Sequence, residues 1–515
     1  MQKKAHVCTL HSHCSFSPLP HRSDIRIART KTFGRVNSSN SCHFLSSTGT
    51  HWVNMEHPLS LDETLAGIAK IFEKRLGKEC PKTLLSSLVQ NVEKAEMSED
   101  VISMLDKKIK TWIAQNKVSL IDADVPSTIL PFGYTASLVD VKVKSRGPDD
   151  TIYKNNPEIR SMIPRGLTLI HLHGQEKKFD VILYANKKFT GGVGDEDESQ
   201  PENDDSWREY CLAPPETATD LICMTKLNGE AAHFSGRFLC GQFYIITGSK
   251  NVHMILKNKD EIDLYEGSRY SVAKVIARAV FEALEKLDQE SRHLVYSLLH
   301  HTKSTVLSEI LQPKHQHIVN LSSIEKPGIN VIMLTPTFID EEESSLTAFP
   351  PHHMLDMMGA LGFTCTPFMV TSPDTMPEQK ERVRNELYKE GEVMYFVNGK
   401  GETIGIAKVK TCWYVVLRAL REQTVNSFTA AKKRENWTLQ GRIALAHKRL
   451  NSIQHWLCFS NEYLAKWKKL SAGFLTWLHN EINNRREIAT NIRPHFPIMW
   501  ERFLREEDET DNFVS

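Results

Sequence analysis

Lys226 is the residue of this chain best placed for covalent chemistry, because it ends an apolar run and is followed at once by a polar turn. The run LICM occupies residues 221–224, and the turn LNGE occupies residues 227–230. A protonated lysine is a poor nucleophile, so a reactive one needs desolvation or cationic neighbours that lower its pKa. The apolar run could supply the desolvation, although a lysine at the end of a strand can also simply reach for solvent.

Two later segments carry residues suited to the same chemistry. The segment 245–251 (IITGSKN) predicts a strand that leads into a polar turn at Ser249 and Lys250. Such a turn could hold ribose or phosphate. The segment 304–311 (STVLSEIL) is strand-like and carries a single carboxylate, Glu309.

Two more segments follow in the chain. Residues 390–396 (EGEVMYF) begin with the carboxylate of Glu390 and continue as a β-prone run. Within residues 406–414 (IAKVKTCWY), alternation places Lys408 and Lys410 on one face of a strand.

Together these residues supply a nucleophile, carboxylates and paired cations. Mg²⁺ binds through a few carboxylates plus substrate phosphates, which suits Glu309 and Glu390. Phosphoryl transfer depends on positioning and charge neutralisation, and Lys408 and Lys410 could neutralise phosphate oxygens. We also expect these two cations to lower the pKa of Lys226 by like-charge repulsion.

The five segments resemble, in their order, the motifs of the covalent nucleotidyltransferases: ATP-dependent RNA and DNA ligases and mRNA-capping guanylyltransferases. Lys226 matches the lysine of the K-x-D-G motif, which in that family forms a lysine–nucleoside monophosphate adduct. Glu309 matches the acidic residue of the third motif, Glu390 that of the E-G-x-V motif, and Lys408 and Lys410 the K-x-K motif. The resemblance extends over roughly residues 160–420, and the ordered set is more specific than any single motif.

Among these enzymes the chain most resembles RNA ligases of the phage and tRNA-splicing type. The K-x-K pair runs directly into a helical, aromatic segment, residues 410–418, and the upstream RGL (165–167) and KKF (187–189) are similar to the region before the nucleophile in that group. One departure is Asn228, which stands where the family usually has aspartate. A hydrogen bond to the nucleotide could survive this change, while a charge is lost.

The resemblance implies an ATP-dependent RNA ligase that joins a 5′-phosphate end to a 3′-hydroxyl end in RNA repair or tRNA splicing. Lys226 would form lysyl-AMP, with Mg²⁺, or Mn²⁺ in its place, held by Glu309 and Glu390. The implied nucleotide-binding residues are Asn228, Glu230, Ser249, Lys250, Glu309, Lys408 and Lys410. Arg237 is expected to contact the RNA end or the nucleotide.

Other functions stay open on the sequence alone. A GTP:RNA guanylyltransferase of the capping type would use the same lysine and differ in its nucleotide. A catalytically inactive RNA-binding protein could have kept the fold, and a chance match in an unrelated α+β protein is a further alternative. No phosphate-loop motif and no convincing pair of H-x-[ST] motifs occur. Healing of RNA ends by a kinase or phosphodiesterase is therefore expected from a separate protein.

The implied fold is α+β, with a nucleotidyltransferase domain of antiparallel sheets and flanking helices over residues 126–422. A small helical domain is expected over residues 55–125, with helices after Leu59 and over 99–116. Residues 1–54 are rich in Arg and Ser and poor in acids. They predict a disordered basic leader, with a mitochondrial transit peptide or sequence upstream of a start at Met55 as alternatives.

Residues 423–515 are expected to form a basic helical domain. Between residues 424 and 505 there are 14 lysines and arginines against five acids. Lys432, Lys433, Lys468 and Lys469 could track an RNA backbone, or they could lie on solvated helical faces. Since capping enzymes and DNA ligases, as families, follow the K-x-K strand with a β-rich domain, a helical continuation favours an RNA ligase.

Composition fits an intracellular enzyme. The chain has 515 residues, 40% apolar and 25% charged, with a net charge of +1, so an RNA-binding surface must come from local charge asymmetry. Its ten cysteines show no framework spacing, which favours free thiols and a cytoplasmic or nuclear location. No apolar run approaches the ~20 residues of a membrane span, so no membrane partner is expected.

Overall fold

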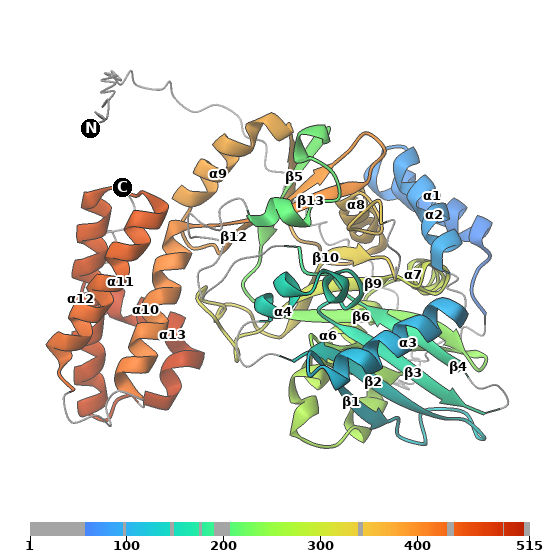
Figure 1. Cartoon of the computed structure of the whole chain (residues 1–515), viewed down its shortest axis with the longest axis horizontal. Helices are drawn as coiled ribbons and strands as arrows, with labels where there is room; N and C mark the ends of the chain where they lie inside the picture. The colour runs from blue at the N-terminus through green and yellow to red at the C-terminus, as the bar shows by residue number, and fades with distance from the viewer. Residues whose placement is uncertain are drawn as a thin grey trace, which may run out of the picture. The chain divides into compact units, whose positions relative to one another are not determined.

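The computed structural model describes residues 57–95, 99–144, 149–174, 178–189, 206–337, 343–429, 437–487 and 489–508. Within these residues the chain forms three antiparallel sheets and thirteen α-helices (Figure 1), so the predicted α+β class is confirmed. No helix in this part of the chain is long and apolar enough to cross a membrane. The leader, residues 1–54, lies outside the described residues.

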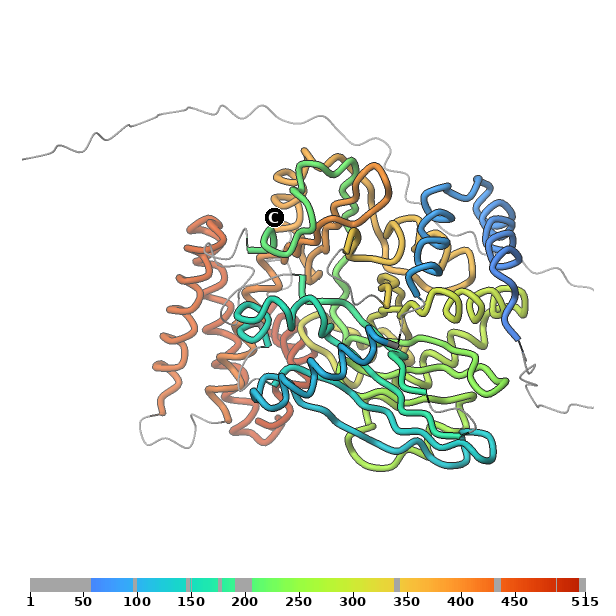
Figure 2. Tube along the Cα trace, turned by 45° about the vertical axis from the view of Figure 1, so that its right-hand side comes forward, coloured from blue at the N-terminus to red at the C-terminus, as the bar shows by residue number. Residues whose placement is uncertain are grey.

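The first two helices are α1 (Leu61–Leu76) and α2 (Lys82–Ala95), where the apolar spacing predicts helix. A capping box begins α1: the Ser60 hydroxyl accepts from the Glu63 N–H, and the Glu63 carboxylate accepts from the Ser60 N–H. Both helices pack on α7 (Gln289–Thr302), as the trace in Figure 2 shows.

The third predicted helix, α3 (Glu99–Ala114), packs on the first sheet. The strands of this sheet, in spatial order, are β1 (Val118–Asp124), β2 (Thr135–Val143), β3 (Leu167–His173) and β4 (Lys178–Tyr184). Residues 55–125 are therefore not helical throughout, because β1 pairs with β2. The sequence signal for β1 is weak, since this edge strand buries only Val118. Two short helices, α4 (Asp150–Asn155) and α5 (Pro157–Met162), lie between β2 and β3.

The second sheet has five strands in the order β10-β9-β6-β7-β8. Their bounds are β6 Glu230–Leu239, β7 Gln242–Ser249, β8 Val252–Leu256, β9 Thr305–Leu311 and β10 Gly328–Thr335. Three helices contact it: α6 (Ser271–Glu285), α7, and α8 (Pro351–Leu361). The amphipathic pattern of residues 271–287 predicts α6 correctly, since its apolar residues are buried.

The third sheet has four strands in the order β11-β5-β12-β13. Their bounds are β5 Asp220–Lys226, β11 Phe368–Thr371, β12 Gly391–Val397 and β13 Thr403–Lys410. The helix α9 (Met376–Asn385) contacts β12 and β13. Short 3₁₀ helices occupy Ser206–Tyr210, Pro215–Thr217, Lys259–Leu264, Ser268–Tyr270, Pro373–Thr375 and Ala489–Asn491. This sheet carries Lys226 at one strand end and the K-x-K pair at another.

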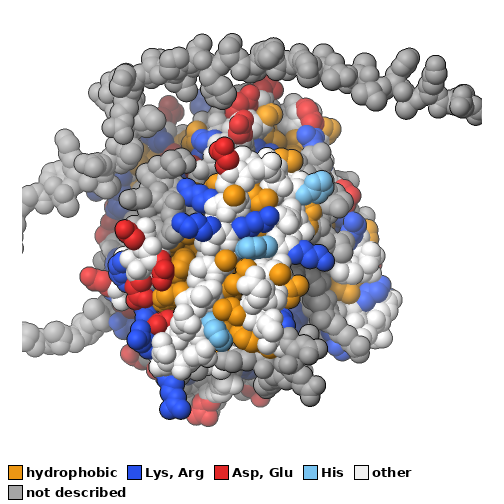
Figure 3. Space-filling model, turned by 90° about the vertical axis from the view of Figure 1, so that its left-hand side faces the viewer, with side chains coloured by type: hydrophobic (Ala, Val, Ile, Leu, Met, Phe, Trp, Pro, Cys, Tyr) orange, Lys and Arg blue, Asp and Glu red, His pale blue; other side chains and the backbone are white. Residues whose placement is uncertain are grey.

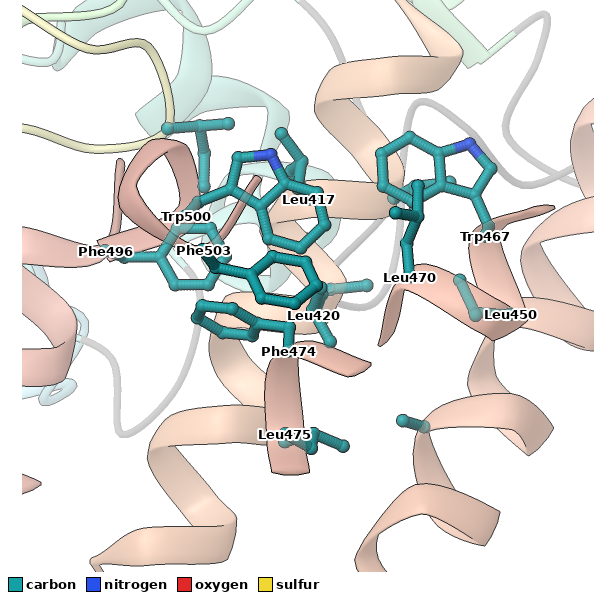
Figure 4. Packing of buried hydrophobic residues seen from close by; sticks show 14 of the residues in the cluster. Leu417, Leu420, Leu450, Trp467, Leu470, Phe474, Leu475, Phe496, Trp500 and Phe503 are labelled. Carbon is teal, nitrogen blue, oxygen red and sulfur yellow. The ribbon is translucent and has the colours of Figure 1, made fainter. Parts of the chain in front are cut away.

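Four helices follow the third sheet and share one apolar core (Figure 4). They are α10 (Cys412–Phe428), α11 (Leu439–Leu457), α12 (Asn461–Asn483) and α13 (Ile492–Glu506). Phe474, Trp500 and Phe503 lie against one another, with ring centroids 5.2 to 5.5 Å apart. The predicted helical character of the C-terminal part is confirmed, and most of its tryptophans belong to the core.

A matched leucine pair tests this four-helix core. Leu475 is 0% exposed, whereas Leu445 is 46% exposed. We expect Leu475→Ala to lower the free energy of unfolding by about 2–5 kcal/mol, because it removes buried methyl groups and leaves a cavity. Leu445→Ala should cost less than about 1 kcal/mol. Urea unfolding followed by tryptophan fluorescence measures both, and equal effects would contradict the assignment of the core.

Candidate functional site

The strand register of the third sheet places the motif lysines on one face. Lys226 on β5 and Lys410 on β13 both lie opposite Gly391 on the strand between them. Two residues along, Val393 lies opposite Lys408. Since positions two apart on a strand share a face, Lys226, Lys408 and Lys410 belong to the same face. The predicted alternation of Lys408 and Lys410 is confirmed.

Glu390 joins two of the predicted site residues through its two carboxylate oxygens. Its Oε1 lies 2.6 Å from Nζ of Lys226, and its Oε2 accepts a 2.6 Å hydrogen bond from Nδ2 of Asn228. The Glu390 side chain is 6% exposed and that of Lys226 is 24% exposed. Asn228 Oδ1 in turn accepts from the N–H groups of Ile318 and Val319. Asn228 therefore holds the β9–β10 connection against the carboxylate that binds Lys226.

Gly229 permits the close approach of this turn to β9. Its N–H donates to Glu309 Oε1 at 2.9 Å. A Cβ at this position would lie 2.2 Å from the carbonyl oxygen of Ile310, a distance that no side chain tolerates. The glycine of the K-x-N-G sequence is therefore required by packing, and it fixes Glu309 beside the lysine.

The charges around Lys226 raise its pKa rather than lower it. Burial alone would lower that pKa, but the carboxylates of Glu390 and Glu309 outweigh burial and raise it above the ordinary value. The expectation that Lys408 and Lys410 hold the nucleophile partly deprotonated is therefore wrong for the unliganded protein. Burial also raises the pKa of Glu309 to about 7, although the charge of Lys226 opposes this shift.

A cavity of about 300 Å³ opens where the second and third sheets meet. Lys226, Glu309 and Lys408 line one part of it, and Lys250 and Arg165 also line it. The apolar and aromatic residues of its wall are Phe189, Met224, Leu227, Leu307, Ile332, Met333, Val393 and Tyr395. Apolar walls with a few convergent charged groups are typical of small-ligand sites, and the volume is at the lower end of their range.

The two lysines of the K-x-K pair have different surroundings. Nζ of Lys408 lies 4.6 Å from the ring centroid of Phe189, a cation–π distance within the cavity wall. Lys410 is only 5% exposed and does not belong to the cavity lining. Its carbonyl oxygen accepts from Arg384 at 2.6 Å, which ties the end of β13 to α9. Lys408 is therefore the member of the pair that can meet a ligand in this cavity.

The predicted polar turn after β7 contributes Lys250 but not Ser249 to the cavity. Lys250 Nζ lies 2.7 Å from Asp149 Oδ2, and Arg165 Nη2 lies 3.0 Å from Asp149 Oδ1. Although burial opposes it, the charges of Arg165 and Lys250, with that of Lys188, hold the pKa of Asp149 below its usual value. Arg165 and Lys250 thus share the carboxylate of Asp149, and both line the cavity.

Glu230 and Arg237 also lie outside the cavity lining, as do Asn228, Ser249, Glu390 and Lys410. Glu230 accepts from Gln312 Nε2 at 2.7 Å, so it fastens the start of β6 to the segment after β9. Arg237 is 3% exposed, and its guanidinium donates to the carbonyl oxygens of Leu299 and Lys303 at the end of α7. The predicted contact of Arg237 with RNA or nucleotide is wrong, because its cationic head is buried at a helix C-terminus.

The predicted RNA-binding lysines are only partly described. Lys468 and Lys469 lie on α12, half-buried and exposed respectively, whereas Lys432 and Lys433 fall outside the described residues. Figure 3 shows a face on which lysine and arginine side chains are scattered between apolar and histidine side chains. On this face the basic surplus does not gather into one patch.

Sequence reasoning missed several residues of the site. Asp149 holds Arg165 and Lys250, and His233 and Tyr395 belong to the cavity wall. Asp149 and His233 lie outside the five segments, and Tyr395 lies in residues 390–396, of which only Glu390 was singled out. The alternation of β6 could have indicated that His233 shares a face with position 231, but the cavity that this face lines exists only once β6 pairs with β9.

The two carboxylates beside Lys226 suit a divalent metal ion that also takes ligands from a bound substrate. Glu309 and Glu390 are two buried acids beside one lysine, a donor set suited to Mg²⁺ or Mn²⁺. No group of three or more Asp, Glu, His or Cys side chains forms a metal site among the residues described. An ion here would therefore also need oxygen ligands from a bound substrate.

Comparison with known proteins places the chain in a family without assigning it an activity. Residues 128–421 match the model of a family described as a domain of unknown function (DUF7920), and the chain belongs to that family. No curated protein matches it. Among solved structures, an archaeal ATP-dependent RNA ligase (form 1) is similar over 74% of this chain and 79% of its own, with 11% identity and a TM-score of 0.38.

The raised pKa of Glu309 predicts a pH-dependent contribution to stability. The folded protein keeps the Glu309 proton up to about pH 7, whereas the ordinary pKa is 4.5. Between these values the folded state binds more protons than the unfolded state, so the free energy of unfolding falls as pH rises. Because glutamine cannot titrate, Glu309→Gln should stabilise the protein more at about pH 8 than at about pH 5. An equal effect at both pH values in urea unfolding would contradict this.

A pair of glycines tests the close approach at Gly229. We expect Gly229→Ala to destabilise the protein by about 1–3 kcal/mol, because the β9 backbone must move to admit the methyl group. Gly328→Ala is the matched control, since nothing lies within 4 Å of its would-be Cβ. Thermal unfolding measures both variants. Equal melting temperatures would show that the turn does not need glycine.

Proposed function

We propose that this member of the DUF7920 family is an ATP-dependent RNA ligase that works through a covalent lysyl-AMP intermediate. One observation carries the proposal: the cavity is lined by Lys226, which contacts Glu390 at 2.6 Å, together with Glu309 and Lys408. These are the lysine and motif residues that match the covalent nucleotidyltransferases. They come from β5, β9 and β13, and only the fold brings them to one place.

The character of the cavity supports a nucleotide as its ligand. Its apolar wall suits a base, and Phe189 and Tyr395 add aromatic surface. Lys408 suits the phosphates, and Lys250 and Arg165 add two further cations to the cavity lining. The base and the triphosphate of ATP thus each have a chemically matched surface.

In the first step, Nζ of Lys226 attacks the α-phosphorus of ATP. A nitrogen–phosphorus bond forms, the bond to the β-phosphate oxygen breaks, and pyrophosphate leaves. Nζ must lose its protons, and Glu390 Oε1 at 2.6 Å is within reach to accept one. Lys408 would neutralise charge on the α-phosphate. When bound by Glu309 and Glu390, Mg²⁺ would supply further positive charge for the phosphate oxygens.

In the second step, AMP passes from Lys226 to the 5′-phosphate of an RNA end. A 3′-hydroxyl then attacks this activated phosphate, the strands join and AMP leaves. The partner is therefore RNA with a 5′-phosphate and a 3′-hydroxyl, and a separate kinase or phosphodiesterase would supply ends of that form. The surplus of nine basic residues between positions 424 and 505 supports an RNA partner, with Lys468 and Lys469 as candidate contacts.

The thiol chemistry supports a reducing compartment for this reaction. The seven cysteines among the described residues are free thiols. We propose the cytoplasm or the nucleus, with a mitochondrial location as the alternative if residues 1–54 act as a transit peptide.

The first test is covalent labelling with α-labelled ATP or GTP in Mg²⁺. Wild-type protein should retain label from ATP in an acid-labile bond, and Lys226→Ala should retain none. Lys408→Ala should label roughly 100-fold more slowly, because charge neutralisation at the phosphate is lost. Lys400→Ala, an exposed lysine at the turn between β12 and β13, is the control and should label normally.

The outcomes separate the candidate functions. Label from GTP alone would favour a capping-type guanylyltransferase. No adduct with either nucleotide, in folded protein, would overturn the proposal and favour an RNA-binding protein without activity. If the ATP adduct forms, the second requirement is that the protein converts 5′-phosphorylated RNA to a joined product. Failure to join the RNA would contradict the ligase assignment.

A further inference from the structure

A chain of buried polar groups leads from the cavity wall to the first sheet. His233 on β6 lines the cavity, and its Nδ1 lies 3.3 Å from Nε2 of His253 on β8. Nδ1 of His253 lies 2.8 Å from Oδ1 of Asp140 on β2. Thr168 on β3 donates to the same oxygen at 3.0 Å. All four side chains are at most 3% exposed.

The surroundings of His233 keep its imidazole neutral. Burial is the largest cause, and with the neighbouring His253 and the charge of Lys250 it lowers the pKa of His233 to about 3. Arg269 also pairs with Asp140, because its Nη2 lies 3.5 Å from Oδ2. A neutral imidazole has one N–H donor and one acceptor nitrogen, so the hydrogen bonds decide which is which.

The carboxylate of Asp140, at the end of this series of polar groups, orders the hydrogen bonds of the two histidines. Asp140 Oδ1 can only accept, so a His253 ring with one proton carries it on Nδ1, which also lies 2.8 Å from Oγ1 of Thr168, and keeps Nε2 as an acceptor. His233 must then donate from Nδ1, which leaves its own Nε2 as an acceptor. Among the residues that the structure describes, no group bonds to this Nε2. Gly166 leaves room for the ring, because a Cβ at that position would lie 2.7 Å from Cε1 of His233.

The strand register sets the distance between His233 and Glu309, which lies beside Lys226. On the paired strands β6 and β9, Ala231 lies opposite Glu309 and His233 lies opposite Leu307, and all four line the cavity. The two rows are two residues apart, or about 7 Å along the strands. A nucleotide whose α-phosphate lies at Lys226 and whose sugar or base extends along β6 would reach His233.

We propose that His233 determines nucleotide specificity: its Nε2 accepts a hydrogen bond from a neutral donor of the bound nucleotide, a ribose hydroxyl or the exocyclic amine of adenine. His253 and Asp140 act as positioning residues that keep this nitrogen an acceptor. The inference rests on the proposed function, because it takes a nucleotide as the ligand of the cavity. It adds a residue that none of the five sequence motifs contains.

The test compares nucleotides within each protein. Labelling efficiency is measured for ATP, 2′-deoxy-ATP, 3′-deoxy-ATP and purine riboside triphosphate, which lacks the amine. Wild-type protein should label more efficiently with ATP than with one of these analogues, by roughly tenfold, because one hydrogen bond is lost. The analogue that labels poorly identifies the donor group of the nucleotide. In His233→Leu that preference should vanish, and His233→Gln should keep part of it because its side chain retains an acceptor. A ratio within one protein does not depend on the fraction that is folded.

Binding of α,β-methylene-ATP, which cannot transfer AMP, is measured in parallel by calorimetry. If His233→Leu keeps every wild-type preference, the role of His233 is overturned while the ligase proposal stands. If wild-type protein binds this analogue and His233→Leu binds it about tenfold more weakly, yet neither protein labels, His233 is supported and the ligase proposal fails. No nucleotide binding by the wild type would overturn both.

Discussion

Glu390 is the residue on which the arrangement of the site depends, because its two oxygens bind two different parts of the chain. One oxygen holds Lys226 and the other holds Asn228, which anchors the β9–β10 connection through two backbone N–H groups. A buried carboxylate deprived of its partners is costly, so the three groups constrain one another. The same contact keeps Lys226 charged in the unliganded protein. Chemistry at this lysine therefore has to begin with a change in the charges that surround Glu390.

The cavity depends on residues from two sheets. The third sheet supplies Lys226 and Lys408, and the second supplies Glu309 and His233. The four-helix part is coupled to this site, since Arg421 on α10 donates to the carbonyl oxygen of His317, next to the backbone that Asn228 holds. The helical part is therefore linked to Lys226 through a short series of contacts.

Local sequence patterns were sufficient to predict many of the helices and the shared face of the lysine pair. Alternation placed Lys408 and Lys410 on one face, and apolar spacing located α1, α3, α6 and the C-terminal helices. Other features depend on contacts between distant residues. Asn228 and Glu390 are 162 positions apart, and a lone arginine such as Arg237 gives no sign in the sequence that it will be buried. The pKa of Lys226 was mispredicted for the same reason: the carboxylates that the fold brings to it outweigh burial, which alone would lower that pKa.

The most direct measurement is peptide mapping by mass spectrometry after incubation of the protein with ATP and Mg²⁺. The account predicts that the peptide containing Lys226 gains the mass of one AMP at neutral pH and loses it after mild acid, as a phosphoramidate should. An AMP adduct on another residue, or an unmodified Lys226 peptide from protein that binds ATP, would contradict it.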